Sequence, residues 1–161
     1  MFDLKNVPKE LQYAIDEKGY DKLTSVQSLI LDPSNSGKDL LVSSQTGSGK
    51  TLAYGLSISC DGLKEIIDES KKLKTVIVTP TRELALQVFN ELVWLFSKTS
   101  MLISTAIGGM DIKKERKNIV KGVDLLVGTP GRINDHMRRK TFDLTHLKTL
   151  VLDEADEMLD L

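Results

Sequence analysis

Eight residues decide the fold of this chain: Ser44-Gln45-Thr46-Gly47-Ser48-Gly49-Lys50-Thr51. They follow a short apolar run, Leu40–Ser43, and precede a segment with helical periodicity. Glycines let the backbone turn so that several N–H groups face one anion, and the start of the next helix adds its dipole. Lys50 can reach the β- and γ-phosphates of a nucleotide, and Thr51 can ligate Mg²⁺. The stretch predicts a phosphate-binding loop between a strand and a helix.

The loop departs from the strict pattern at one position. That pattern begins with glycine, whereas this chain has Ser44. The prediction therefore rests on Gly47, on Gly49-Lys50-Thr51 and on the strand before and the helix after. The alternative is a glycine-rich turn that carries a surface lysine.

Short apolar runs alternate with helical segments along the rest of the chain. Such runs, rich in leucine and β-branched residues, are typical of strands covered on both faces. We expect five strands, at Leu40–Ser43, Thr75–Thr79, Leu102–Ile107, Val123–Val127 and Thr149–Leu152. We expect crossover helices between them at Leu52–Glu69, Arg82–Lys98, Asp111–Lys121 and Gly131–Arg139. The pattern predicts an α/β fold with a doubly wound, mainly parallel sheet.

Two further helices are predicted before the first strand. One opens at Pro8 and closes near Gly19, and the other is capped by Thr24 and ends near Pro33. We expect residues 1–38 to form a helical cap and residues 39–161 to form the core of one domain.

Composition excludes several classes of protein. With 161 residues, 40% of them hydrophobic and 28% charged, the chain can bury a core. Its single cysteine excludes a disulfide scaffold, and its net charge of −1 gives no general attraction for a polyanion. No apolar run approaches the roughly 20 residues of a membrane span. We expect a cytoplasmic protein, or a nuclear one if the source is eukaryotic.

Some charged and aromatic residues are assigned no function. The basic run Lys113–Lys117 is expected to be a solvated helix face, and Trp94 is expected to pack in the core. His136 and His146 are isolated in the sequence and are expected to be surface or packing residues.

The last predicted strand runs into Asp153-Glu154-Ala155-Asp156. Ligands of open parallel sheets bind at the carboxyl ends of the strands, so these acids are expected at the edge that carries the phosphate loop. Asp153 can hold Mg²⁺ through water, and Glu154 can orient and deprotonate the attacking water. The alternative is a helix N-terminus whose dipole favours acidic residues.

Several further motifs occur in a fixed order: Gly19-Tyr20 with Thr24-Ser25-Val26-Gln27, Pro80-Thr81-Arg82-Glu83-Leu84-Ala85, Gly108-Gly109 and Thr129-Pro130-Gly131-Arg132. Together with the phosphate loop and the acidic motif, they resemble the DEAD-box family of RNA helicases, in superfamily 2. In that family they correspond to the Q motif, motif Ia, the glycine doublet and motif Ib. Phe2 matches an isolated upstream aromatic, and Leu23 replaces the usual proline.

The resemblance implies the ATP-binding, RecA-like N-terminal lobe of a helicase, a three-layer α/β/α P-loop fold that binds ATP with Mg²⁺. The residues implied for ATP are Phe2, Tyr20, Thr24, Gln27 and Ser44–Thr51. Gln27 would read adenine, because an amide both donates and accepts hydrogen bonds. The residues implied for the RNA backbone are Pro80, Thr81, Arg82, Gly108, Gly109, Thr129, Pro130, Gly131 and Arg132. Asp156 would couple this lobe to a second RecA-like lobe.

The family's next motif, a Ser-Ala-Thr strand, and its second lobe have no counterpart in the 161 residues. Related P-loop ATPases place that strand between the phosphate-loop strand and the acidic strand. We therefore expect unpaired backbone groups in the middle of the sheet, and a chain that is unstable, rearranged or completed by another chain. Turnover by this chain alone should be negligible. The alternatives are a P-loop ATPase acting on DNA or protein, and a non-catalytic binding fragment.

Overall fold

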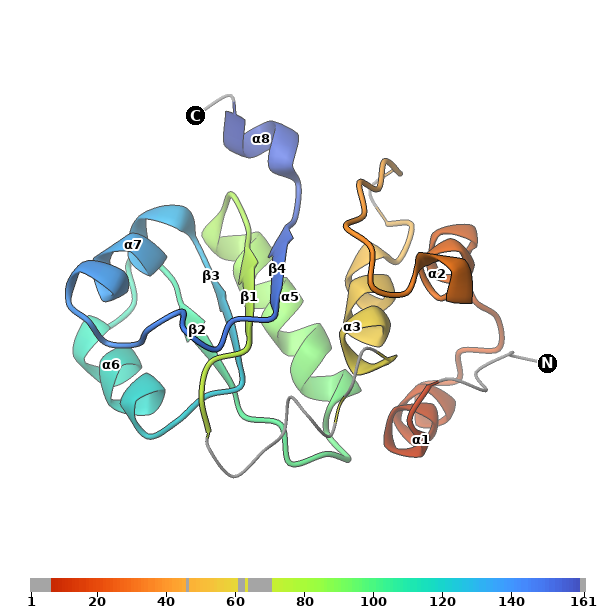
Figure 1. Ribbon diagram of the computed structural model, residues 1–161, viewed down its shortest axis with the longest axis horizontal. Helices are drawn as coiled ribbons and strands as arrows, with labels where there is room; N and C mark the ends of the chain where they lie inside the picture. The colour runs from red at the N-terminus through yellow and green to blue at the C-terminus, as the bar shows by residue number, and fades with distance from the viewer. Residues whose placement is uncertain (1–6, 46, 61–62, 64–70, 160–161) are drawn as a thin grey trace. The chain divides into compact units, whose positions relative to one another are not determined.

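The computed structural model describes residues 7–45, 47–60, 63 and 71–159 (Figure 1). The chain divides into two compact units. The first unit is Met1–Glu65 with Glu91–Ser100, and the second is Ile66–Asn90 with Met101–Leu161. The phosphate loop belongs to the first unit, and the sheet belongs to the second.

The first unit is helical in its described part. Its helices are α1 (Lys9–Glu17), α2 (Ser25–Ile30), the 3-10 turn η1 (Pro33–Asn35) and α3 (Lys50–Cys60). Pro8 directly precedes α1, and the Thr24 and Gln27 side chains close a capping box at the start of α2, so both predicted helices are confirmed. A Cβ at Gly55 would lie 2.7 Å from Leu95, which shows how closely α3 packs on the end of α5 (Arg82–Leu95).

The second unit contains a parallel four-stranded sheet in its described part, in the order β2-β3-β1-β4. The strands are β1 (Thr75–Val78), β2 (Ile103–Ala106), β3 (Leu125–Gly128) and β4 (Thr149–Leu152). Each lies within two residues of a predicted strand, and the α/β class with a parallel sheet is confirmed. The two central strands are the most apolar and buried, as expected for strands covered on both faces.

Helices α6 (Ile112–Val120) and α7 (Pro130–Arg138) share a core with the sheet. Ile119 and Ile133 of these helices belong to one buried hydrophobic cluster with Val76 and Leu126, which are register partners on β1 and β3. The short helix α8 (Ala155–Leu159) follows β4. Among the described residues, none of the helices has the length and apolar character that crossing a bilayer requires.

One predicted strand is wrong. Leu40–Ser43 is described without strand pairing, and Leu41 is fully exposed. An apolar run becomes a strand only where a neighbour accepts its backbone hydrogen bonds, and no described strand does so here. Helix α3 follows the loop as predicted, but most of the predicted range beyond Cys60 lies outside the described residues.

Candidate functional site

The phosphate loop in the first unit is held closed by its own residues. The Lys50 ammonium donates a hydrogen bond to the Ser44 carbonyl at 3.0 Å, and the Ser44 and Ser48 hydroxyls lie 2.8 Å apart. Gly47 and Gly49 have φ values of 77° and 82°, which L side chains rarely adopt. Helix α3 begins at Lys50, so the N–H groups of its first turn, which have no partner one turn earlier within the helix, border the loop. Of the predicted strand before the loop and helix after it, only the helix is present in the structure. The predicted Thr46 lies outside the described residues.

Gln27 ties the phosphate loop to helix α2. Its side chain is 3% exposed, its Oε1 accepts from the Thr24 N–H at 2.9 Å, and its Nε2 donates to the Gly49 carbonyl at 3.2 Å. A Cβ at Gly49 would collide with Nε2 of Gln27, so this loop position requires glycine for space as well as for φ. The structure therefore brings together the predicted adenine-reading residue and the predicted phosphate-binding loop.

Tyr20 lies against an aromatic side chain that sequence reasoning assigned to the core. The Tyr20 and Trp94 ring centroids are 5.9 Å apart, and the Lys18 ammonium lies 5.3 Å from the Trp94 ring. Tyr20 remains 47% exposed, so one side of its ring is open to solvent. Its partner in the prediction, Phe2, lies outside the described residues.

In the second unit, four predicted motifs meet at one edge of the sheet. The last residues of the strands are in register, with Val78 opposite both Gly128 and Leu152, and Ala106 opposite Gly128. Each motif directly follows one strand: Pro80–Arg82 follows β1, Gly108–Gly109 follows β2, Thr129–Arg132 follows β3, and Asp153–Asp156 follows β4. This edge is the carboxyl edge, where ligands of parallel sheets bind.

The glycine doublet forms a tight turn under an exposed arginine. The Ile107 carbonyl accepts from the Met110 N–H at 3.3 Å, so Gly108 and Gly109 are the central residues of this turn. The Thr129 hydroxyl accepts from the Gly108 N–H at 3.3 Å. The Arg82 guanidinium lies so close to the doublet that a Cβ at Gly109 would collide with it. Three of the predicted RNA motifs thus touch each other.

The predicted RNA residues differ in exposure. Thr81, Arg82, Gly109, Pro130 and Gly131 are exposed, and Pro80 and Gly108 are partly buried. The two remaining residues are turned inward: Thr129 is 9% exposed, and the Arg132 side chain is 11% exposed.

The acidic motif begins with a buried aspartate and a strained glutamate. Asp153 is 7% exposed, and its Oδ1 accepts from the Glu154 N–H at 3.1 Å. Glu154 has a φ of 49°, a left-handed conformation that costs a non-glycine residue roughly 1–2 kcal/mol. Such strain persists where surrounding structure imposes it, often at functional sites. Asp156 is exposed in the first turn of α8.

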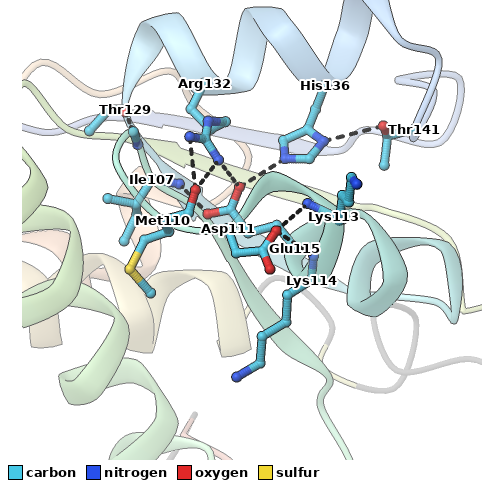
Figure 2. Close-up of polar contacts among 11 residues, drawn as sticks. Ile107, Met110, Asp111, Lys113, Lys114, Glu115, Thr129, Arg132, His136 and Thr141 are labelled. Atoms are coloured by element: carbon cyan, nitrogen blue, oxygen red, sulfur yellow. Dashed lines mark hydrogen bonds and ion pairs between the residues drawn. The ribbon is translucent and has the colours of Figure 1, made fainter.

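Sequence reasoning missed a largely buried charged cluster that contacts Ile107 and Met110, the residues on either side of the glycine doublet (Figure 2). Glu115 on α6 is 5% exposed and forms an ion pair of 2.7 Å with Arg132 on α7. His136, which is fully buried on α7, places its Nε2 3.0 Å from the same carboxylate oxygen. His136 was expected to be a surface or packing residue; it is a buried packing residue, and its polar partners were not foreseen. The available signal was the spacing of Arg132 and His136, which places both on one face of a helix.

Two carboxyl groups away from these motifs have lowered pKa values. Hydrogen bonds from Ser34 lower the pKa of Asp32, which caps the η1 turn, and Lys38 adds a smaller attraction. Hydrogen bonds from Thr145 lower the pKa of Asp143. Both are cases in which donors favour the charged form of an exposed acid.

Comparison with known proteins gives a consistent result. The family model for the DEAD/DEAH box helicase matches residues 24–161. The chain is 41% identical to the ATP-dependent RNA helicase CshA of Limosilactobacillus reuteri, over 92% of this chain, and 39% identical to the ATP-dependent RNA helicase HAS1 of Chaetomium globosum, over 99%. A crystal structure of a hypothetical ATP-dependent RNA helicase from Sulfolobus tokodaii superposes with a TM-score of 0.82 at 32% identity. The superposed region covers 94% of this chain and 43% of the Sulfolobus chain.

The matched relatives are much longer than this chain. The 161 residues span 29% of the Limosilactobacillus protein and 27% of the Chaetomium protein. The family model nevertheless covers the phosphate loop, the three motifs at the sheet edge and the acidic motif without interruption. The chain therefore belongs to the DEAD/DEAH box helicase family.

Proposed function

We propose that this chain is the ATP- and RNA-binding lobe of an RNA helicase, which couples ATP hydrolysis to local unwinding or remodelling of RNA. The observation that carries the proposal is the carboxyl edge of the sheet, where the four strands end in register. The acidic motif and the three predicted RNA motifs follow these strand ends, and the exposed Arg82 lies in one of them. The names of the matched relatives, which are ATP-dependent RNA helicases, support it.

ATP would bind at the phosphate loop. The N–H groups of the first turn of α3 and the glycine backbone suit an anion, and the Lys50 ammonium would exchange the Ser44 carbonyl for a phosphate oxygen. Gln27 already uses one acceptor site and one donor of its amide within the protein. An amide carries two donors and two acceptor lone pairs, so a second pair remains for an adenine edge.

Magnesium is implied by this chemistry, and the donor set suits it. The Thr51 hydroxyl in the first unit and the Asp153 carboxylate in the second are each hard oxygen ligands, which Mg²⁺ prefers. In nucleotide enzymes Mg²⁺ is usually held by one or two side chains together with phosphate oxygens and water. When bound, the ion would neutralise charge on the phosphates.

Glu154 is the residue we assign as general base. It would orient and deprotonate the water that attacks the γ-phosphate. Full catalysis would also need an arginine from a second lobe, because such arginines contribute on the order of 10³–10⁵ in rate in other nucleotide hydrolases. We therefore expect this chain alone to bind nucleotide weakly, with negligible turnover.

RNA would be held by its backbone, without reading of bases. Arg82 supplies a positive charge, and the glycine doublet offers close approach of the main chain. Selectivity for RNA over DNA would come from contacts to the 2′-hydroxyl groups.

Binding measurements on the full-length protein test both sites. We expect a labelled single-stranded RNA to bind more tightly with a non-hydrolysable ATP analogue than without it, and DNA of the same sequence to bind more weakly than RNA. Lys50→Ala should remove the effect of the analogue, and Arg82→Ala should weaken RNA binding with or without it. Arg116→Ala, an exposed arginine on α6, serves as the control and should change neither. Equal binding of RNA and DNA would contradict the assignment to RNA.

A further inference from the structure

The buried carboxylate of Glu115 contacts the residue that precedes the glycine doublet. Its Oε1 accepts a hydrogen bond from the Ile107 N–H at 2.8 Å. Its Oε2 accepts from Nη1 of Arg132 at 2.7 Å and lies 3.0 Å from Nε2 of His136 (Figure 2). Both oxygens therefore have partners within the protein, and the residue is buried.

Arg132 contacts the residue that follows the doublet. Both of its terminal nitrogens donate to the Met110 carbonyl, each at 3.1 Å, while Nη1 also reaches Glu115. The planar guanidinium presents its donors in a fixed fork, so one side chain can bridge a carbonyl and a carboxylate. Glu115 and Arg132 together hold the Ile107 N–H and the Met110 carbonyl, which are the outer polar groups of the turn around Gly108 and Gly109.

His136 supports Glu115 from the other side. It lies four residues after Arg132, on the same face of α7, and it is completely buried. Its Nδ1 lies 3.2 Å from the Thr141 hydroxyl, so both ring nitrogens have partners. The ring is thereby fixed in one orientation, and it limits the positions that the Glu115 carboxylate can take.

We propose that Glu115 is a positioning residue for RNA binding, and that Arg132 acts through the same clamp and not by contact with RNA. The proposal rests on the RNA-binding function proposed above and assigns the direct phosphate contact to Arg82. Arg82 is exposed beside Gly109, whereas the Arg132 side chain is only 11% exposed and its guanidinium is hydrogen-bonded to Glu115 and Met110. Buried ion pairs often add little net stability, and a role in fixing local geometry explains why three polar side chains are buried here.

The salt dependence of RNA binding separates contact from positioning. Each phosphate neutralised on a single strand contributes about 0.7 to the slope of log Kd against log salt concentration. In the full-length protein, Arg82→Ala should lower that slope by about 0.7. Arg132→Ala and Glu115→Ala should each weaken RNA binding by about tenfold while the slope stays as in the wild type. The affinity for ATP should not change in any of the three variants.

A double variant tests whether the two residues act as one unit. Because both hold the same turn, Glu115→Ala combined with Arg132→Ala should weaken binding little more than the stronger single change. Glu115→Gln keeps the size of the side chain, so it guards against loss of folding, but its single acceptor oxygen cannot serve the Ile107 N–H and Arg132 as the two carboxylate oxygens do. It should weaken RNA binding less than Glu115→Ala. Hydrogen exchange of the Ile107 amide should be faster in both Glu115 variants than in the wild type.

The outcomes distinguish this proposal from the proposed function. A wild-type protein that binds no RNA overturns the proposed function and with it the role assigned to Glu115. If the wild type binds RNA but Arg132→Ala lowers the salt slope as much as Arg82→Ala does, Arg132 touches phosphate and only the positioning proposal is overturned. Wild-type RNA affinity and wild-type Ile107 exchange in Glu115→Gln would also overturn it.

Discussion

Replacing Gly109 with alanine tests how the exposed turn of the proposed RNA surface is built. Gly109 has a φ of 82°, and a left-handed conformation costs an L residue roughly 1–2 kcal/mol. The new Cβ would collide with Nη1 of Arg82 and lie 2.8 Å from its Cζ. Because the guanidinium is the end of a flexible, exposed side chain, it can move away at little cost to folding. We expect Gly109→Ala to lower the free energy of unfolding by about 1–2 kcal/mol and to weaken RNA binding by displacing Arg82.

The neighbouring glycine provides a matched control. A Cβ at Gly108 would have its nearest contact at 3.6 Å, an ordinary van der Waals distance, and Gly108 does not have a left-handed φ. Gly108→Ala should therefore change the free energy of unfolding by no more than about 0.5 kcal/mol. Urea unfolding of the two variants measures the difference, with equal slopes against denaturant as a check on the comparison.

A second control tests whether Gly109→Ala weakens RNA binding by displacing Arg82. In an Arg82→Ala background, Gly109→Ala should still destabilise the protein but should no longer weaken RNA binding. If the two glycine variants are equally stable, the conformational argument is wrong. If Gly109→Ala weakens RNA binding equally with and without Arg82, displacement of the guanidinium is not the cause.

Three further predictions concern other parts of the chain. Glu154→Gly should raise the free energy of unfolding by about 1 kcal/mol, because glycine tolerates the φ of 49°; unchanged stability in urea would show that the residue is not strained. Gln27→Ala removes the capping box and the bond to Gly49 and should lower stability by about 1–2 kcal/mol, whereas Ser28→Ala on the exposed face of α2 should not. Ser34→Ala should raise the pKa of Asp32 toward its ordinary value in an NMR titration. Because the folded-state pKa of Asp32 is lowered, its contribution to stability is present above the ordinary pKa and is lost as the pH falls through the lowered value. If Ser34→Ala leaves the titration of Asp32 unchanged, the hydrogen bonds from Ser34 are not the cause of the lowered pKa.

Four of the five predicted strands are present, and each of them pairs with another predicted strand in the described sheet. β1 and β3 are continuous buried runs, and burial on both faces is a property that sequence alone reports well. Leu40–Ser43 has the same apolar character but is described without a pairing strand, with Leu41 fully exposed. Whether a run finds a neighbour depends on residues distant in the sequence, so composition could not decide this case.

The meeting of four motifs at one sheet edge followed from the sequence, whereas the clamp behind them did not. Parallel strands place their carboxyl ends together, so the positions of Arg82 and Asp153 could be predicted from strand order alone. Glu115 lies within the basic run Lys113–Lys117, which was expected to be solvated throughout. Its burial depends on α7 covering it with Arg132 and His136, a tertiary contact that leaves no local signal at Glu115.

ATP hydrolysis with and without single-stranded RNA tests whether this chain is the nucleotide-binding lobe of an RNA helicase. We expect RNA to stimulate hydrolysis by the full-length protein. Glu154→Gln should abolish this hydrolysis, whereas Glu157→Gln, a change to an exposed acid on α8, should not. Residues 1–161 alone should show negligible hydrolysis. Hydrolysis that is unaffected by RNA, or that survives Glu154→Gln, would show that the assignment is wrong.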